Sequence, residues 1–314
     1  MSPQNYPRIH HSTPQKDGLL DVTRLVPHTR KIPPKEMAKL VRQAIRKANQ
    51  KSSRDHFSLP PDASPEETLA VYQRAGRDLF KYFKQYCGDP ASTAHQIYGK
   101  HYREVAREEF RNRTVQKGRM NSGWRYQFLL LDCAIHSGRF QQISHIGAAE
   151  ADFNAVIEFI EPEKDPLNLY VSVKNRKNTM GGQDWPKAIA ALEKVANSDK
   201  NRIGPYCCVF AIAMDKGERH IKIERKTGRA YSVNTEVWLS DFLWPFFANY
   251  SYEDIMSFVL DVLLNSTQAT PLPAQMSVPD ELLDSFGEAC AEAGLIDQSG
   301  VFNDPHKLVV FFCK

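Results

Sequence analysis

Apolar residues alternate with small or polar ones in two neighbouring segments near the middle of the chain. The first segment covers residues 150–159 and the second covers residues 170–177. The stretch between them, residues 161–168, contains two prolines and an Asn, which break strands. The pattern therefore predicts two strands that pair as a hairpin.

This hairpin brings a carboxylate close to a lysine. Side chains on a strand alternate between its faces, so Ser172 and Lys174 share one face, and Glu150 shares a face with Asp152. Pairing is expected to place Asp152 beside Lys174. A carboxylate with further oxygen ligands suits Mg²⁺, and a lysine helps to neutralise the charge that builds on a phosphorus under attack. The pattern indicates a nuclease, with an ordinary charged surface hairpin as the alternative.

Helices are predicted on both sides of the hairpin. Apolar spacing or capping residues indicate helices over 34–50, 64–87, 93–116, 122–136 and 183–196, and largely helical structure over 239–264. Ser64-Pro-Glu-Glu67 has the signature of a capping box. The continuous apolar run over 206–214 is typical of a strand buried on both faces, and residues 220–233 predict a further hairpin. The central order is strand, strand, helix, strand, so the expected fold class is α/β (α+β), a mixed sheet flanked by helices with a largely helical N-terminal region.

Composition permits a large folded core. The chain has 314 residues, of which 42% are hydrophobic and 25% charged, enough for one large domain or two smaller ones. No apolar run is long enough to cross a bilayer, and the polar N-terminus lacks the apolar core of a signal peptide. The six cysteines are scattered without zinc-type spacing and are expected to be reduced core residues. We therefore expect a cytoplasmic enzyme that has no membrane partner.

Charge changes sign along the chain. Residues 1–145 contain 25 Lys and Arg against 13 Asp and Glu, residues 146–234 contain 14 against 12, and residues 235–314 contain 2 against 12. Clustered cations attract a polyanion, so we expect the N-terminal part to face DNA and the acidic part to be kept away from it. The candidate phosphate contacts on the first helix are Lys39, Arg42 and Arg46. Solvated helix faces are the alternative.

The Asp, turn, then Ser-Val-Lys arrangement resembles the core of the PD-(D/E)xK nuclease superfamily, with Ser172 where an acidic residue usually stands. NgoMIV-like restriction enzymes have a Ser-x-Lys version, in which the displaced acidic ligand comes from the helix that follows. A narrower resemblance, to ApaLI-like type II restriction endonucleases, spans about residues 121–264. It rests on Asn121-Ser-Gly-Trp-Arg-Tyr-Gln127, Glu150-Ala-Asp-Phe-Asn154, Val173-Lys-Asn-Arg-Lys-Asn-Thr-Met-Gly-Gly-Gln-Asp-Trp-Pro186 and Tyr231-Ser-Val-Asn-Thr-Glu-Val-Trp238.

The resemblance implies a Mg²⁺-dependent type II restriction endonuclease that hydrolyses both strands of double-stranded DNA at a short palindromic site. GTGCAC, the site of the enzyme that names the family, is the candidate sequence. A palindrome implies a homodimer, and a cognate DNA methyltransferase is expected in the same system but not as a stable subunit. The expected regions are a polar N-terminal arm (1–33), a basic helical DNA-contacting region (34–120), the nuclease core (121–264) and an acidic C-terminal region (265–314).

The resemblance also implies the site residues. Asp152 is the expected metal ligand, and Lys174 is the expected catalytic lysine. Ser172 either contacts metal-bound water or fills space. The second acidic ligand stays open: Glu150 is favoured slightly, and the alternatives are Asp184, which could instead cap a helix, and Glu193, which could instead be a solvent-exposed helix residue.

The polar segment after Lys174 is the expected DNA-contacting loop. Its candidate contacts are Arg176, Lys177, Asn178, Thr179 and Gln183. Arg and Lys suit phosphates or guanine, and Asn and Gln can read adenine edges, whereas an ordinary polar loop is the alternative.

Other functions fit the same residues. The chain could be a non-catalytic DNA-binding protein whose Ser-Val-Lys departure marks a decayed site, or a structure-specific or nicking nuclease with the same core. The acidic C-terminal region could also be a partner-binding module.

Overall fold

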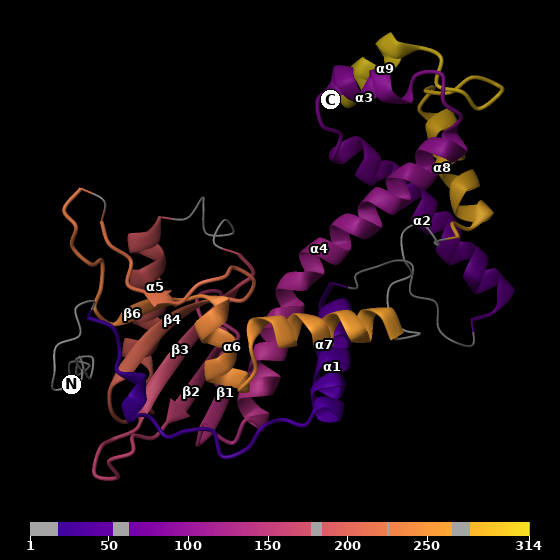
Figure 1. Ribbon diagram of the computed structural model, residues 1–314. Coiled ribbons are helices and arrows are strands. Elements are labelled where there is room, and N and C mark those ends of the chain that lie inside the picture. The colour runs from indigo at the N-terminus through magenta and orange to yellow at the C-terminus, as the bar shows by residue number, and fades with distance from the viewer. Residues whose placement is uncertain (1–17, 53–62, 177–183, 225, 266–276, 314) are drawn as a thin grey trace. The chain divides into compact units, whose positions relative to one another are not determined.

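The computed structural model describes residues 18–52, 63–176, 184–224, 226–265 and 277–313. The chain divides into two compact units (Figure 1). Unit 1 comprises Met1–Ala48 and Ser122–Ala269, and unit 2 comprises Asn49–Asn121 and Thr270–Lys314. Two helices, α1 (Pro34–Ser52) and α4 (Tyr102–His136), cross this boundary along the chain. The units therefore follow boundaries other than those of the four regions expected from the sequence.

Unit 1 is built on a six-stranded mixed sheet in the order β1-β2-β3-β4-β6-β5. The strands are β1 (Gln142–His145), β2 (Phe153–Ile157), β3 (Leu167–Lys174), β4 (Tyr206–Ile212), β5 (Arg219–His220) and β6 (Thr235–Trp238). Neighbours β1, β2 and β3 pair antiparallel, and β3, β4 and β6 run parallel, while β5 pairs antiparallel to β6. The predicted mixed sheet flanked by helices is confirmed.

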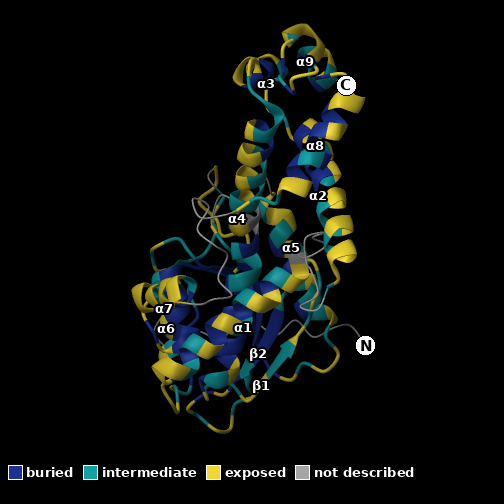
Figure 2. Cartoon of the chain, turned by 90° about the vertical axis from the view of Figure 1, so that its right-hand side faces the viewer, coloured by how far each residue is buried: buried dark blue, intermediate teal, exposed yellow. Residues whose placement is uncertain are grey.

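The predicted hairpin is present as β2 and β3. Phe153 pairs with Val171, and Ile157 pairs with Leu167. Its first strand begins later than predicted, because the backbone N–H of Ile146 bonds to the carbonyl of Asp152 at 3.0 Å and closes the β1–β2 connection there. The sequence analysis missed β1, since this edge strand is short, polar and partly exposed, whereas most of β2 is buried (Figure 2).

Helices cover both faces of the sheet. The C-terminal part of α4 packs with α1, α6 (Ser240–Ala248) and α7 (Tyr252–Asn265) on one face. The other face is covered by α5 (Trp185–Ser198). Side chains of β3 alternate between the two cores, with Val171 and Val173 in the first and Tyr170 in the second. Ser172 and Lys174 therefore belong to the α5 face.

The helix α1 is amphipathic, as predicted. Met37, Leu40 and Val41 are buried in the unit 1 core. The opposite side is exposed and basic. One of its cations, Lys47, forms an ion pair with the buried Asp132 on α4, with its Nζ 2.9 Å from both carboxylate oxygens. A short 3₁₀ helix, η1 (Val22–Arg24), precedes α1 in the same unit.

Unit 2 is helical and has its own core. Its elements are α2 (Pro65–Gln85), α3 (Pro90–Ile97), the N-terminal part of α4, α8 (Asp280–Glu292) and α9 (Pro305–Phe312). The capping box is confirmed at Ser64 and Glu67. Gly76 allows α2 to approach α8 closely, because a Cβ there would overlap with the backbone carbonyl of Leu282.

Two predicted helices have the wrong bounds. A single long α4 replaces the helices expected over 93–116 and 122–136, and the short α3 ends at Ile97. The break falls between these helices, where Gly99 has a φ of 78°, a conformation that a helix cannot continue. The Gly in the middle of α4, Gly118, is tolerated within the helix.

Basic and acidic segments that are far apart along the chain come together in unit 2, so this unit has almost no net charge. This unit has 15 Lys and Arg against 16 Asp and Glu, whereas unit 1 has 26 against 21. Arg77 of α2 lies 2.8 Å from Glu292, and Arg103 of α4 lies 2.9 Å from Asp280. The acidic α8 is thus paired with basic residues of α2 and α4 inside unit 2, and the net positive charge lies in unit 1.

No helix in the described ranges is long and apolar enough to cross a membrane. Cys133 and Cys290 are buried free cysteines, and burial raises the pKa of their thiols. Cys313 is exposed, so it is not a core residue as the sequence analysis expected.

Candidate active site at the ends of β2 and β3

Asp152 lies directly before β2 and is held by two hydrogen bonds. Its Oδ2 accepts from the backbone N–H of Val173 at 2.6 Å, and its Oδ1 accepts from Nε2 of Gln127 on α4. The backbone N–H of Asp152 also donates to the carbonyl of Val171 at 2.8 Å. These bonds fix the carboxylate against the last residues of β3.

Lys174 is the last residue of β3, immediately after the residue that binds Asp152. Its side chain is partly exposed, on the same face of the strand as Ser172. Ser172 is only 2% exposed, which favours packing over contact with solvent. The hairpin thus brings the sequence positions of Asp152 and Lys174 to the same end of the strand pair, and the expected pairing of their side chains stays a prediction.

Within unit 1, α4 begins at Ser122, and this end of the helix lies beside Asn175, the residue that follows β3. Asn175 Nδ2 donates to Ser122 Oγ at 3.0 Å, and a Cβ on Gly123 would lie 3.5 Å from the same Nδ2. The Oδ1 of Asn175 is buried and has no hydrogen-bond partner within the described part of the chain.

A second carboxylate reaches this end of the sheet from β4. Asp215 Oδ1 lies 3.9 Å from Nη1 of Arg176, two residues after Lys174. The parallel pairing of β3 and β4 explains the contact, because it directs the chain that leaves both strands toward the same edge. Sequence reasoning did not propose Gln127, Asn175 or Asp215 as site residues. The only signal for Asp215 is that it is the first charged residue after a fully buried strand.

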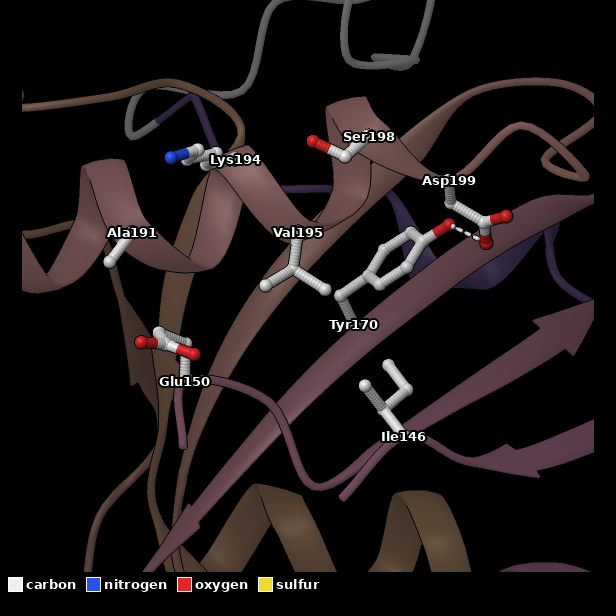
Figure 3. A pocket seen from close by; sticks show the side chains of 8 residues that line it. All are labelled: Ile146, Glu150, Tyr170, Ala191, Lys194, Val195, Ser198 and Asp199. Atoms are coloured by element: carbon white, nitrogen blue, oxygen red, sulfur yellow. Dashed lines mark hydrogen bonds between the residues drawn. The ribbon is translucent and has the colours of Figure 1, made fainter. Parts of the chain in front are cut away.

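Glu150 lies in the connection between β1 and β2 and is exposed, so strand alternation does not fix its face. It lines a pocket of about 610 Å³ on the α5 side of the sheet (Figure 3). Tyr170 lines the same pocket and donates from its hydroxyl to Asp199 at 2.7 Å. Burial is the main cause that raises the Tyr170 pKa, followed by the hydrogen bond to Asp199.

The two alternative acidic ligands have other partners. Asp184 occupies the N-cap position of α5 without a side-chain capping bond, and its carboxylate lies 3.3 Å from Lys187. Glu193 accepts hydrogen bonds from Ser232 and from Thr235, the latter at 2.6 Å. Thr235 opens β6, which lies two strands away from β3. Glu193 therefore holds α5 to β6.

The candidate DNA contacts are only partly visible. Lys177, Asn178, Thr179 and Gln183 lie outside the described residues. Arg176 is exposed, and so are the three predicted contacts on α1, namely Lys39, Arg42 and Arg46. All four of these described cations belong to unit 1.

The donors at this site are suitable for Mg²⁺ but few. Among the described residues, no group of three or more His, Cys, Asp or Glu side chains could hold a metal. Mg²⁺ nevertheless needs only one or two carboxylates, because waters and substrate phosphates complete its coordination.

The sequence matches no protein-family model, and it has no significant match among curated proteins.

Proposed function

We propose that this protein is a Mg²⁺-dependent type II restriction endonuclease that hydrolyses both strands of double-stranded DNA at a short palindromic site. One observation carries the proposal: the carboxylate of Asp152 is bonded to the backbone of Val173, directly before Lys174. The order β2, β3, α5, β4 supports it, because the PD-(D/E)xK resemblance implies this order. GTGCAC is the site that the resemblance suggests.

Each residue has a distinct task in this mechanism. Asp152 would hold the ion together with a second oxygen donor, for which Glu150 and Asp215 are the candidates, with Asp184 the remaining sequence alternative. Mg²⁺, when bound, supplies charge neutralisation at the phosphorus. The Lys174 ammonium stabilises the negative charge that develops on the phosphate oxygens during attack by water. Gln127 and the Val173 N–H keep the Asp152 carboxylate in place.

DNA binding follows from the charge of unit 1. Its excess of Lys and Arg attracts the phosphate backbone, and the exposed cations Lys39, Arg42, Arg46 and Arg176 are the proposed contacts. Reading a palindrome requires two copies related by a two-fold axis, so the proposal includes a homodimer. A DNA methyltransferase that protects the host is the expected companion in the same system.

The direct test is cleavage of a sequenced plasmid by the purified protein in Mg²⁺, beside a reaction in EDTA, with sequencing of the fragment ends. Discrete Mg²⁺-dependent fragments with 5′-phosphate ends support the proposal and identify the site. Nicked circles without linear plasmid would point instead to a structure-specific or nicking nuclease.

A non-catalytic DNA-binding protein is the second candidate. It is favoured by Ser172, which stands where the superfamily usually has an acidic ligand, and by the hydrogen bonds that both oxygens of Asp152 already accept. Such a protein would shift DNA in gels with steep salt dependence, yet leave it uncut with every divalent metal tested.

A further inference from the structure

The described residues between β5 and β6, 221–224 and 226–234, are called the ribbon below and form an irregular two-stranded hairpin. Ile223 pairs with Ala230 in an antiparallel bridge, and the backbone N–H of Tyr231 donates to the carbonyl of Lys222 at 3.0 Å. At the tip, the N–H of Gly228 donates to the carbonyl of Glu224 at 2.9 Å. Gly228 has a φ of 67°, which suits a tight hairpin turn.

The ribbon exposes apolar and basic side chains together. Ile223 is 56% exposed, Val233 is 53% exposed and Tyr231 is 38% exposed. Lys226 and Arg229 are exposed at the tip. No described atom lies within 4 Å of the position that a Cβ on Gly228 would occupy, so the tip is surrounded by open space. An exposed aromatic beside cations is an unfavourable surface for a lone protein but a favourable one for contact with nucleic acid.

The base of the ribbon is fixed to α5. Nζ of Lys222 lies 4.6 Å from the ring centroid of Trp185, and Ser232 Oγ donates to Glu193. Trp185 is the first residue of α5, which follows the loop that leaves β3 after Lys174. The ribbon is therefore anchored at the start of the helix whose preceding loop is the proposed DNA contact.

The pairing determines which side chains share a face of the ribbon. Lys222 lies opposite Tyr231, because the N–H of Tyr231 donates to the carbonyl of Lys222. Glu224 lies opposite Arg229, because the N–H of Glu224 donates to the carbonyl of Arg229. Alternation along each strand then places all four on one face, and this is the face that Lys222 turns toward Trp185. Arg229 and Tyr231 are thus neighbours on the side of the ribbon nearest to α5.

We propose that the ribbon enters the major groove of the DNA duplex, where Lys226 contacts phosphate and where Arg229 and Tyr231 contact bases. The major groove is about 12 Å wide and admits a two-stranded ribbon, and Arg is the side chain that most often reads guanine there. The charge of the exposed tip is complementary to phosphate. This inference rests on the proposed function and adds a specificity element to it.

The test uses fluorescence anisotropy of the full-length protein with a labelled duplex that contains the cleavage site, in EDTA so that no cleavage occurs. The variants are the double change Lys226→Ala with Arg229→Ala, and the single change Tyr231→Ala. Lys200→Ala is the matched control, because Lys200 is also exposed but follows the opposite end of α5. Circular dichroism melting checks that each variant remains folded.

The double variant is expected to bind at least about tenfold more weakly, and its log–log salt slope should fall by about 0.9, since the one lost phosphate contact, that of Lys226, removes about that much. Its preference over a scrambled duplex should also decrease, because Arg229 contacts a base. Tyr231→Ala is expected to reduce the same preference. Lys200→Ala should leave both quantities unchanged.

The outcomes separate the two proposals. If wild-type protein cleaves DNA and the ribbon variants bind with its affinity, salt slope and sequence preference, the ribbon inference is overturned and the nuclease proposal stands. If wild-type protein neither binds nor cleaves DNA, both fail. If it binds through the ribbon but never cleaves, the ribbon inference is supported and the nuclease proposal fails.

Discussion

The Oδ2 of Asp152 accepts a 2.6 Å hydrogen bond from the backbone N–H of Val173. This bond ties the residue directly before β2 to the residue before Lys174, across the hairpin. Because a backbone N–H cannot move without breaking the sheet, the carboxylate keeps its position whether or not a cation is bound. Preorganisation of this kind is what a charge-stabilising site requires.

Gln127 is expected to act as a positioning residue, because its Nε2 donates to the second oxygen of Asp152. Gln127→Ala should lower the cleavage rate about tenfold at limiting Mg²⁺, with a smaller loss at saturating Mg²⁺. The measurement is the cleavage rate as a function of Mg²⁺ concentration. Gln141→Ala is the control, since Gln141 makes a similar bond to Glu158 on the exposed side of the sheet. If the Mg²⁺ dependence of Gln127→Ala equals that of wild type, Gln127 does not position the metal ligand.

Lys47 is expected to stabilise unit 1 through Asp132. The Asp132 side chain is 8% exposed, so Lys47→Ala leaves a nearly buried carboxylate without its cation. We expect the free energy of unfolding to fall by about 2 kcal/mol, less than for a fully buried pair because Lys47 itself is 44% exposed. In urea unfolding, Lys216→Ala, which breaks an exposed pair with Glu253, should cost much less than Lys47→Ala. Equal losses in the two variants would contradict this account.

His28 should make the fold sensitive to acid. Burial, and secondarily the charge of Arg139, lower the pKa of His28 below its ordinary value of 6.5. As the pH falls below 6.5, the unfolded chain binds a proton that the folded chain resists, so stability is lost from 6.5 down to the folded pKa.

His28→Gln is expected to remove this loss. Its free energy of unfolding, measured in urea at several values between about pH 5 and 8, should improve relative to wild type as the pH falls. His95→Gln, on the exposed surface of α3, serves as the control. A constant difference between His28→Gln and wild type at all pH values would show that His28 is not the group responsible.

Two glycines of unit 2 should respond to alanine in opposite directions. A Cβ at Gly76 would overlap with α8, so Gly76→Ala should destabilise the protein by at least about 1 kcal/mol. Gly118 lies in α4 with no described atom within 4 Å of a Cβ position, so Gly118→Ala should stabilise it by roughly 0.5–1 kcal/mol. Thermal melting measures both changes, and a shift of the same sign in both would contradict the α2–α8 packing.

Local patterns in the sequence predicted much of unit 1. The β2–β3 hairpin, the buried β4 and the amphipathic α1 each have a periodicity or composition that sets their structure from within the segment. The short edge strand β1 lacks such a pattern, and its pairing depends on β2. The break before α4 depends on the four residues that lie between α3 and α4. A hydrophobic pattern that is assessed over a longer stretch of sequence does not detect so short an interruption.

Long-range contacts were beyond the sequence. The acidic α8 pairs with α2, a segment about 200 residues away along the chain, as in the ion pair of Arg77 with Glu292. Counts of charge along the chain do not predict such a pairing. At the candidate site, Asp152 and Lys174 were predicted from the hairpin alone. Gln127 was not, because no local rule indicates which helix will face the end of β2.

The most direct test of the account is the single-turnover rate of cleavage of the cognate duplex by Asp152→Asn and Lys174→Ala in saturating Mg²⁺. Asp261→Asn and Lys200→Ala are the matched controls, with the same chemical changes at exposed positions of unit 1. The account predicts that each site variant loses at least about a hundredfold in rate while it still binds DNA, and that the controls cleave like wild type. Cleavage by Asp152→Asn at the wild-type rate would contradict the assignment of this site.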